Sequence, residues 1–453
     1  MGLVVALWLA GESMPALADG AWSELQALPE ARQEFPAVLL DGKIYTAGGM
    51  MNSTATAVNR FESYDIRSNR WQRLRDLPLP VHHTAMATVG GRIYVLGGAT
   101  GTSTPSDRVF AYDPEANTWS ERARLPRATW AAAAVTYQER IYLFSGTAAS
   151  NFSSNPGVPH TQVYTSGTDS WSTNYSPLPL PRNHMAAVRI GTQVYVSPGR
   201  SANAAEQADR RLHRYDLVRN MWTELAQLPE FFRSGSAMAQ VHGTLYFIGG
   251  EGSGPVLNKV HAYDPGSNAW RRVPDLPEGR HGMGAVTVGN VIYVPGGGFQ
   301  NGIGPSARVF AFVVPQADPL PFGVWARGFF NSGDPASGPD DDFDGDGLTT
   351  LDEFALNLDP GVVSVTPRPR LRRSETNQFF LEYERGRGRA VQWDLLISTN
   401  LTEWNVAVPA VDWAQNGTTD LGLGTERVSV EIFPRGRDRL FLRLKPGLSK
   451  SSG

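Results

Sequence analysis

The sequence predicts an all-β protein, most of which is one motif repeated six times. Of its 453 residues, 47 are glycine and 32 are proline, and only 19% are charged. This balance favours many short strands and turns over helices. The segment 92–119 shows the motif: a strand that ends in a glycine pair, a loop, a strand with a tyrosine, and a strand that opens on a tryptophan. Because the same order recurs along the chain, the fold class rests on the repeat.

Three marks locate each repeat between residues 21 and 314. A strand carries a tyrosine, at Tyr45, Tyr94, Tyr142, Tyr195, Tyr246 and Tyr293. A glycine pair or its relic follows, at 48–49, 97–98, 145–146, 198–199, 249–250 and 296–297. A tryptophan followed by Leu-Pro separates the repeats, at Trp22, Trp71, Trp119, Trp171, Trp222 and Trp270. Glycine lets a strand end turn where a Cβ would clash, and the aromatic rings supply apolar area for packing sheet on sheet.

This pattern resembles the kelch repeat, in which four antiparallel strands form one blade of a β-propeller. The array opens with the Trp22 strand and closes with a strand at 309–313 that has no tryptophan strand after it. The resemblance therefore implies a six-bladed kelch β-propeller. The N-terminal strand would complete the sixth blade and leave no free sheet edge.

The N-terminus predicts export. Residues 3–10 are an apolar run too short to span a bilayer, and 16–18 show the small-x-small pattern of a signal peptidase site. We expect a signal peptide at 1–18, a secreted, periplasmic or cell-surface protein, and no transmembrane span in the mature chain. No Lys or Arg precedes the apolar run, so a start codon placed too late, or a disordered or misannotated N-terminus, stays open as an alternative.

Composition excludes several kinds of site. The chain has no cysteine, which rules out disulfides, thiolate metal sites and cysteine nucleophiles and leaves the redox compartment undecided. It also rules out the cysteine-crosslinked copper site of galactose-oxidase-like enzymes. A net charge of -3 argues against nucleic acid as the main partner, because no basic surplus exists to neutralise phosphates.

Beyond the propeller, which we expect over 19–316, an acidic segment within 317–361 matches the calcium-loop register. Counting Asp342 as position 1 places acids at 1, 3 and 5, glycine at 6 and glutamate at 12. The ligands would be Asp342, Asp344, Asp346, the Leu348 carbonyl, Thr350 and Glu353. The segment resembles the loops of dockerin and thrombospondin type 3 modules, which implies a structural Ca²⁺; the alternative is an acidic, solvated turn.

Residues 362–453 predict a small β-sandwich. Five runs alternate polar and apolar residues in the strand manner, at 379–386, 391–398, 402–409, 427–434 and 439–446. The order of calcium loop and strand runs resembles the C-terminal appendage of bacterial secreted proteins.

The candidate binding residues lie before the innermost strand of each blade. The positions thirteen residues before the strand tyrosines are Arg32, Val81, Thr129, Arg182, Arg233 and Arg280. In kelch propellers these positions lie on loops at one end of the central channel, so the resemblance implies a ring bearing four arginines. The next two positions add Glu34, His82, His83, Trp130, Asn183, His184 and His281. Arg200 and Glu251, directly after glycine pairs, should face the same opening.

Guanidinium groups suit a carboxylate or phosphate, and a tryptophan at the rim suits a sugar or aromatic ring. The alternative for the arginines is that they bond backbone carbonyls and merely close the blades. His82 and His83 are adjacent, so on a strand their side chains would point to opposite faces and chelate poorly. We therefore expect ordinary loop histidines there rather than a zinc site.

Three functions remain open. The leading interpretation is a binding module that recognises an extracellular protein or acidic glycan through the channel-mouth loops. The rival is a sugar-acid epimerase or mutarotase resembling N-acetylneuraminate epimerases. Glu34 or Glu251 would be its acid–base group, and Arg182 or Arg280 its carboxylate clamp. No epimerase-specific motif supports this rival. The third interpretation is an architectural surface protein that binds no small ligand.

Overall fold

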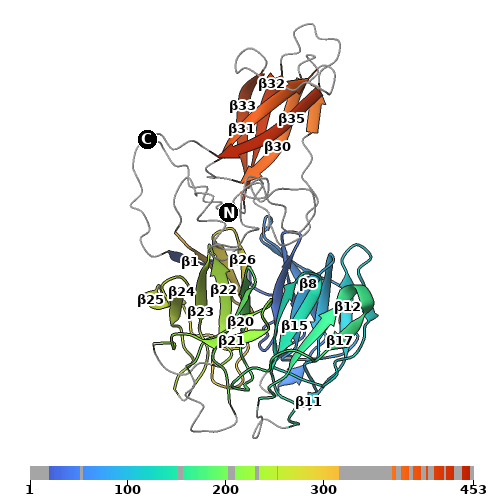
Figure 1. Cartoon of the computed structure of the whole chain (residues 1–453), viewed down its shortest axis with the longest axis vertical. Coiled ribbons are helices and arrows are strands. Elements are labelled where there is room, and N and C mark those ends of the chain that lie inside the picture. The colour runs from blue at the N-terminus through green and yellow to red at the C-terminus, as the bar shows by residue number, and fades with distance from the viewer. Residues whose placement is uncertain are drawn as a thin grey trace, which may run out of the picture.

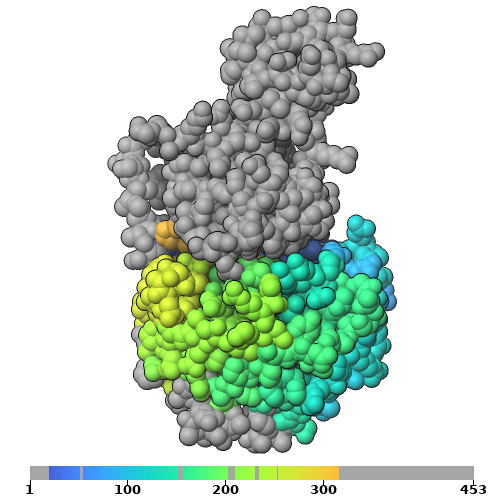
Figure 2. Space-filling model, viewed as in Figure 1, coloured from blue at the N-terminus to red at the C-terminus, as the bar shows by residue number. Residues whose placement is uncertain are grey.

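Six four-stranded antiparallel sheets surround a central axis in the computed structural model (Figure 1). The structure describes residues 20–51, 55–150, 157–201, 210–229, 234–252 and 254–315, and the strands between 370 and 448. Each sheet is one blade, so the six-bladed propeller is confirmed. The blades follow one another closely along the wall shown in Figure 2, from cyan in the second blade to yellow-green in the fifth.

The strands run from the axis outward in chain order. Blade 1 holds β2 (Ala37–Leu40), β3 (Lys43–Ala47), β6 (Phe61–Asp65) and β7 (Arg70–Arg73). Blade 2 holds β8 (Ala85–Val89), β9 (Arg92–Leu96), β12 (Val109–Asp113) and β13 (Thr118–Glu121). Blade 3 holds β14 (Ala133–Tyr137), β15 (Arg140–Phe144), β16 (Thr161–Thr165) and β17 (Ser170–Ser172). Blade 4 holds β18 (Ala187–Ile190), β19 (Gln193–Val196), β20 (His213–Asp216) and β21 (Met221–Glu224). Blade 5 holds β22 (Ala237–Val241), β23 (Thr244–Ile248), β24 (Val260–Asp264) and β25 (Ala269–Val273).

The sixth blade joins the two ends of the array. Its strands are β26 (Val286–Val288), β27 (Val291–Pro295), β28 (Val309–Val313) and the N-terminal β1 (Ala21–Leu25). β1 pairs antiparallel with β28, with Trp22 opposite Phe312. The predicted closure by the N-terminal strand is therefore confirmed, and it leaves β28 no free edge.

The remaining elements of the propeller are short. They are the hairpins β4 (Met50–Met51) with β5 (Thr56–Ala57) and β10 (Ala99–Thr100) with β11 (Thr104–Pro105), and the 3-10 turn η1 (Ser166–Thr168). Among the described residues no helix combines the length and the apolar character needed to cross a membrane.

The repeated tryptophans join neighbouring blades at the outer rim. The indole of Trp119 donates a hydrogen bond to the Arg75 carbonyl of the blade before it, at 2.8 Å. The Arg75 amide in turn donates to Asn117, which also accepts from the Tyr112 hydroxyl. The same three bonds recur with Trp71, Trp171, Trp222 and Trp270. We call these contacts the rim joints.

The described strands between residues 370 and 448 form two further antiparallel sheets. The first contains β29 (Arg370–Arg373), β30 (Phe379–Gly386), β34 (Thr425–Ile432) and β33 (Trp413–Gly422). The second contains β32 (Asn405–Val406), β31 (Val391–Ser398) and β35 (Phe441–Leu448). β30 and β31 have the expected bounds, whereas β29 and β33 were not expected. The sandwich, the domain boundaries, the signal peptide and the calcium loop stay predictions; the last two lie outside the described residues.

Candidate functional site

Six backbone segments, one from each blade, meet around the axis and bond to one another in a closed ring. Each donates its amide N–H to the carbonyl of the equivalent residue in the preceding blade, at 2.6 to 3.0 Å. All six residues have a left-handed backbone, with φ between 50° and 61°. We call this the axial ring; its members are Glu34, His83, Ala131, His184, Gly235 and Gly282.

A second layer of contacts surrounds the axial ring at the end of the channel. The residue before each ring member forms an isolated β-bridge with the residue that follows the glycine pair of the same blade. We call this layer the collar; its bridges are Gln33–Met50, His82–Ala99, Trp130–Thr147, Asn183–Arg200, Ser234–Glu251 and His281–Gly298. Ring and collar bring residues from all six blades to one place, as expected from the repeat alignment.

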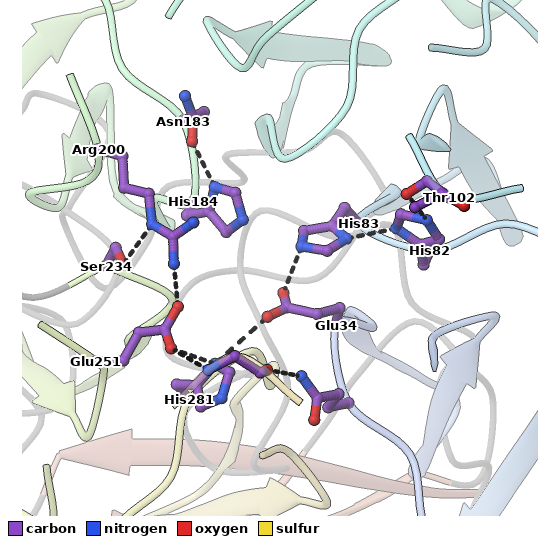
Figure 3. Close-up of polar contacts among 12 residues, drawn as sticks. Glu34, His82, His83, Thr102, Asn183, His184, Arg200, Ser234, Glu251 and His281 are labelled. Carbon is purple, nitrogen blue, oxygen red and sulfur yellow. Dashed lines mark hydrogen bonds and ion pairs between the residues drawn. The ribbon is translucent and has the colours of Figure 1, made fainter. Parts of the chain in front are cut away.

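Charged side chains of the ring and collar form one connected cluster (Figure 3). Glu34 faces His83 through Oε2, 3.1 Å from Nε2, and faces His281 through Oε1, 3.4 Å from Nδ1. His281 Nδ1 also lies 3.6 Å from Glu251, which is paired with Arg200. All of these except Arg200 are buried, so the cluster is a low-dielectric site in which each charge needs its partner.

The cluster shifts its members' pKa values in different directions. Burial alone would raise the pKa of Glu34, but attraction to His83 and the hydrogen bond from His281 outweigh it and lower that pKa to about 2. Burial lowers the pKa of His281, but Glu34 and Glu251 outweigh it and leave that pKa raised. Burial lowers the pKa values of His83 and His184 well below the usual histidine range. The cluster therefore favours an ionised Glu34, while burial disfavours the charged forms of His83 and His184.

The arrangement of the adjacent histidines differs from the one predicted from strand geometry. His82 and His83 do not point to opposite faces; their Nδ1 atoms lie 2.5 Å apart. Both precede β8, and the left-handed φ of His83 turns its side chain back toward its neighbour. The rule that successive side chains alternate holds only for extended backbone.

The expectation that arginines line the channel mouth is also corrected. Arg32, Arg182 and Arg280 are fully buried, and each donates to a backbone carbonyl near the glycine pair of its own blade. Arg32 is also ion-paired with Glu62, and Arg280 with Glu278. These side chains tie strands within a blade and offer nothing to a ligand, which was the alternative interpretation. Arg233, the fourth member, lies outside the described residues.

Trp130 is likewise not a rim residue. Its ring is fully buried, lies edge-on to His83 and His184 at 5.1 and 5.8 Å, and donates to the Ala149 carbonyl. It therefore packs the histidines in place and does not offer a stacking face for a sugar. Asn183, a candidate from the repeat alignment, bonds His184. Ser234 was not predicted but joins the cluster, because its hydroxyl accepts from Arg200 at 3.1 Å. The collar position of Ser234 in the repeat was the available signal.

A cavity of about 170 Å³ runs along the axis from the axial ring between the innermost strands. Its wall is mostly small side chains, including Ala85, Ala133, Ala187 and Ala237. Glu34, His83 and His184 also line it. The polar cluster therefore borders a narrow space that suits water or a small ligand group rather than a large ligand.

The repeat, the blade order and the rim joints can be compared with known proteins. The profile described as the KLHDC2/KLHL20/DRC7 Kelch-repeats domain matches residues 16–153 and 82–297, together more than half of the chain. The chain belongs to the kelch-repeat family. The kelch resemblance inferred from the repeats is thereby confirmed.

Individual relatives match to different extents. The kelch-like protein terF of Aspergillus terreus is 27% identical over 66% of this chain and 69% of its own length. Human Kelch-like protein 25 is 32% identical, but the match covers 26% of this chain and only 21% of the human protein. The solved structure titled "Structure of YjhT" superposes with a TM-score of 0.54 at 16% identity, over 63% of this chain and 95% of that one. That likeness is one of fold.

Proposed function

We propose that this kelch-repeat protein is an exported binding module whose loops at the collar end capture an extracellular partner protein. The observation that carries the proposal is a difference between the two ends of the propeller. At the end away from the collar, the two inner strands of every blade are joined by two-residue turns. At the collar end, the second and third strands are joined by connections of 11 to 16 residues, namely 48–60, 97–108, 145–160, 197–212, 249–259 and 296–308.

Loops that differ in length and sequence on a constant scaffold are where binding specificity is usually placed. The collar-end loops also hold Phe299, which is 44% exposed and follows the collar residue Gly298. The collar also carries Arg200, whose side chain is partly exposed, and exposed aromatic rings and arginines are both enriched at protein-binding surfaces. The predicted acidic-glycan site depended on a ring of arginines, and the burial of Arg32, Arg182 and Arg280 favours a protein partner instead.

Site-specific photo-crosslinking on the full chain tests this proposal. A photoreactive phenylalanine analogue replaces Phe299 at the collar end or Val218, which is 70% exposed in the turn between β20 and β21 at the other end. Exposed to the extracellular fraction, the Phe299 position should form a discrete protein adduct that excess unlabelled protein suppresses and that Phe299→Ser protein does not. The Val218 position is the matched control.

Equal adducts from both positions would contradict the proposal. A glycan array is probed in parallel. Binding on the array alone would mean that the partner is an acidic glycan and not a protein. NMR of any sugar-acid hit would reveal turnover by an isomerase. No described contact favours that rival, because its proposed clamps, Arg182 and Arg280, are buried.

We also propose a structural Ca²⁺ in the loop that begins at Asp342. The support is its sequence register alone, with oxygen ligands at positions 1, 3, 5, 7, 9 and 12. Calcium in place of a chelator should raise the melting temperature of the full chain; an unchanged temperature would contradict the assignment.

A further inference from the structure

Three members of the axial ring bring nitrogen and oxygen donors together on the propeller axis. One ligand atom each of Glu34, His83 and His184 lies within 4.8 Å of the other two, and all three residues are buried. The donors come from blades 1, 2 and 4, so only closure of the propeller brings them together. The backbone bonds of the axial ring fix the three Cα positions independently of what the side chains do.

The hydrogen bonds of His82 and His83 indicate which nitrogen of His83 faces the axis. His82 Nε2 lies 3.3 and 3.1 Å from the carbonyls of Gly101 and Thr102, so this nitrogen carries the proton. In the neutral ring, His82 Nδ1 then accepts, and the neighbouring His83 Nδ1 must donate across their 2.5 Å contact. With Nδ1 engaged by His82, His83 has Nε2 for the axis, where it faces Glu34 Oε2 at 3.1 Å.

The distance between Glu34 Oε2 and His83 Nε2 suits two donors that share one cation. A separation of 3.1 Å is close to the ~3.0 Å expected for two ligands at right angles, each ~2.1 Å from a metal ion. The geometry of the pair is therefore that of two neighbouring metal ligands.

The polar atoms of His184 and Glu34 that face away from the axis contact other side chains, as is common for metal ligands. His184 Nδ1 is bonded to the Asn183 side-chain oxygen, which leaves Nε2 as its coordinating atom. Glu34 uses Oε1 toward His281 and keeps Oε2 for the axis. Such outer contacts orient the ligands and set their tautomers.

The other three positions of the axial ring carry little or no side chain. They are Ala131, which lies between His83 and His184, and the neighbouring Gly235 and Gly282. A Cβ on Gly282 would lie 2.5 Å from the Glu34 carboxyl group, so glycine is needed for that carboxylate to lie where it does. Glu34, His83 and His184 all line the axial cavity, so further coordination positions of a bound ion would face that cavity.

We propose that Glu34, His83 and His184 bind one divalent transition-metal ion on the propeller axis. Two imidazoles and one carboxylate with open positions are the donor set of zinc and non-haem iron(II) sites, whereas Ca²⁺ and Mg²⁺ prefer oxygen alone. The site is distinct from the predicted calcium loop in its residues and in its chemistry. It is also independent of the proposed partner binding.

Binding of Co²⁺ and Zn²⁺ to untagged full-length protein tests the site. The protein is stripped with chelator and titrated in excess Ca²⁺, which saturates oxygen-only sites. The ligand variants are Glu34→Gln, His83→Asn and His184→Asn, because asparagine tolerates the left-handed backbone of these positions. The matched control is His242→Asn, which changes a histidine of the same left-handed φ in the β22–β23 turn, at the far end of the channel.

Wild type and His242→Asn should each bind one equivalent of metal, and each ligand variant should bind it at least ~100-fold more weakly. Because a variant can misfold, the Co²⁺ complex of wild type is also examined by NMR, where hyperfine-shifted N–H signals of two imidazoles are expected. Absence of a bound equivalent, absence of those signals, or wild-type affinity in folded ligand variants would each overturn the proposal.

Discussion

The rim joints and the axial ring are both repeated around the propeller, but the rim joints depend on side chains and the axial ring does not. At the rim the bonds are made by side chains, so the same tryptophan, tyrosine and asparagine recur; only one joint replaces asparagine, by Asp169. At the axis the bonds are made by backbone amides and carbonyls. The six residues there are free to differ, and they are glutamate, histidine, alanine, histidine and two glycines.

This difference teaches where function can reside in a repeat protein. A position whose side chain holds the scaffold cannot also be varied for chemistry. A position held by its backbone can carry any side chain that tolerates a left-handed φ, which costs a residue other than glycine about 1 kcal/mol or more. The donors Glu34, His83 and His184 occupy positions of the second kind.

The largest effect is expected from a side chain at the axial end that nevertheless serves the scaffold. Arg32→Met leaves Glu62 buried without its partner, which should lower the free energy of unfolding by about 3–5 kcal/mol in urea titrations. The double variant Arg32→Met with Glu62→Leu should recover much of the loss, because it removes both charges. A fully stable single variant would mean that Arg32 is not structural.

A smaller effect is expected from one rim joint. Tyr263→Phe removes the 2.6 Å bond to Asn268 and should lower the free energy of unfolding by about 1 kcal/mol. Burial, with Tyr195, raises the pKa of Tyr263 to about 12 from its ordinary value near 10. A raised pKa contributes stability that is present below pH ~10 and is lost as pH rises through about 12. Urea midpoints measured across this range should therefore fall less steeply for the variant than for wild type.

The smallest effect is expected at the axial ring itself. Ala131→Gly removes a Cβ from a residue with φ of 52° and leaves the backbone bonds in place. Relief of strain and the greater freedom of the unfolded chain oppose each other, so the change in stability should stay below about 1 kcal/mol. A larger loss in thermal or urea unfolding would show that side chains hold the ring, and the contrast with the rim would fail.

The repeat made the propeller predictable. The tyrosine, glycine-pair and tryptophan positions recur because every blade packs against its neighbours in the same way. The absence of a tryptophan strand after 309–313 predicted closure by the Trp22 strand. Aligning the blades also located the site, because residues at equivalent repeat positions meet at one end of the axis. Glu34, His83, His184, Glu251 and His281 were found in this way.

The directions of side chains could not be derived from the same alignment. Arg182 and His184 are two residues apart and were expected to face one opening, yet the arginine lies within its blade and the histidine lies on the axis. The left-handed backbone at the axial ring turns the two side chains in different directions. That conformation depends on a backbone hydrogen bond to a neighbouring blade. The contact between His82 and His83 was missed for the same reason.

The sequence by itself therefore determined the number of blades, their order and the residues that gather at the axis, because these follow from periodic packing along the chain. Only the tertiary structure decided which of those residues face one another. That choice is made by six hydrogen bonds between blades, and each joins residues about fifty positions apart, or across the closure between Glu34 and Gly282.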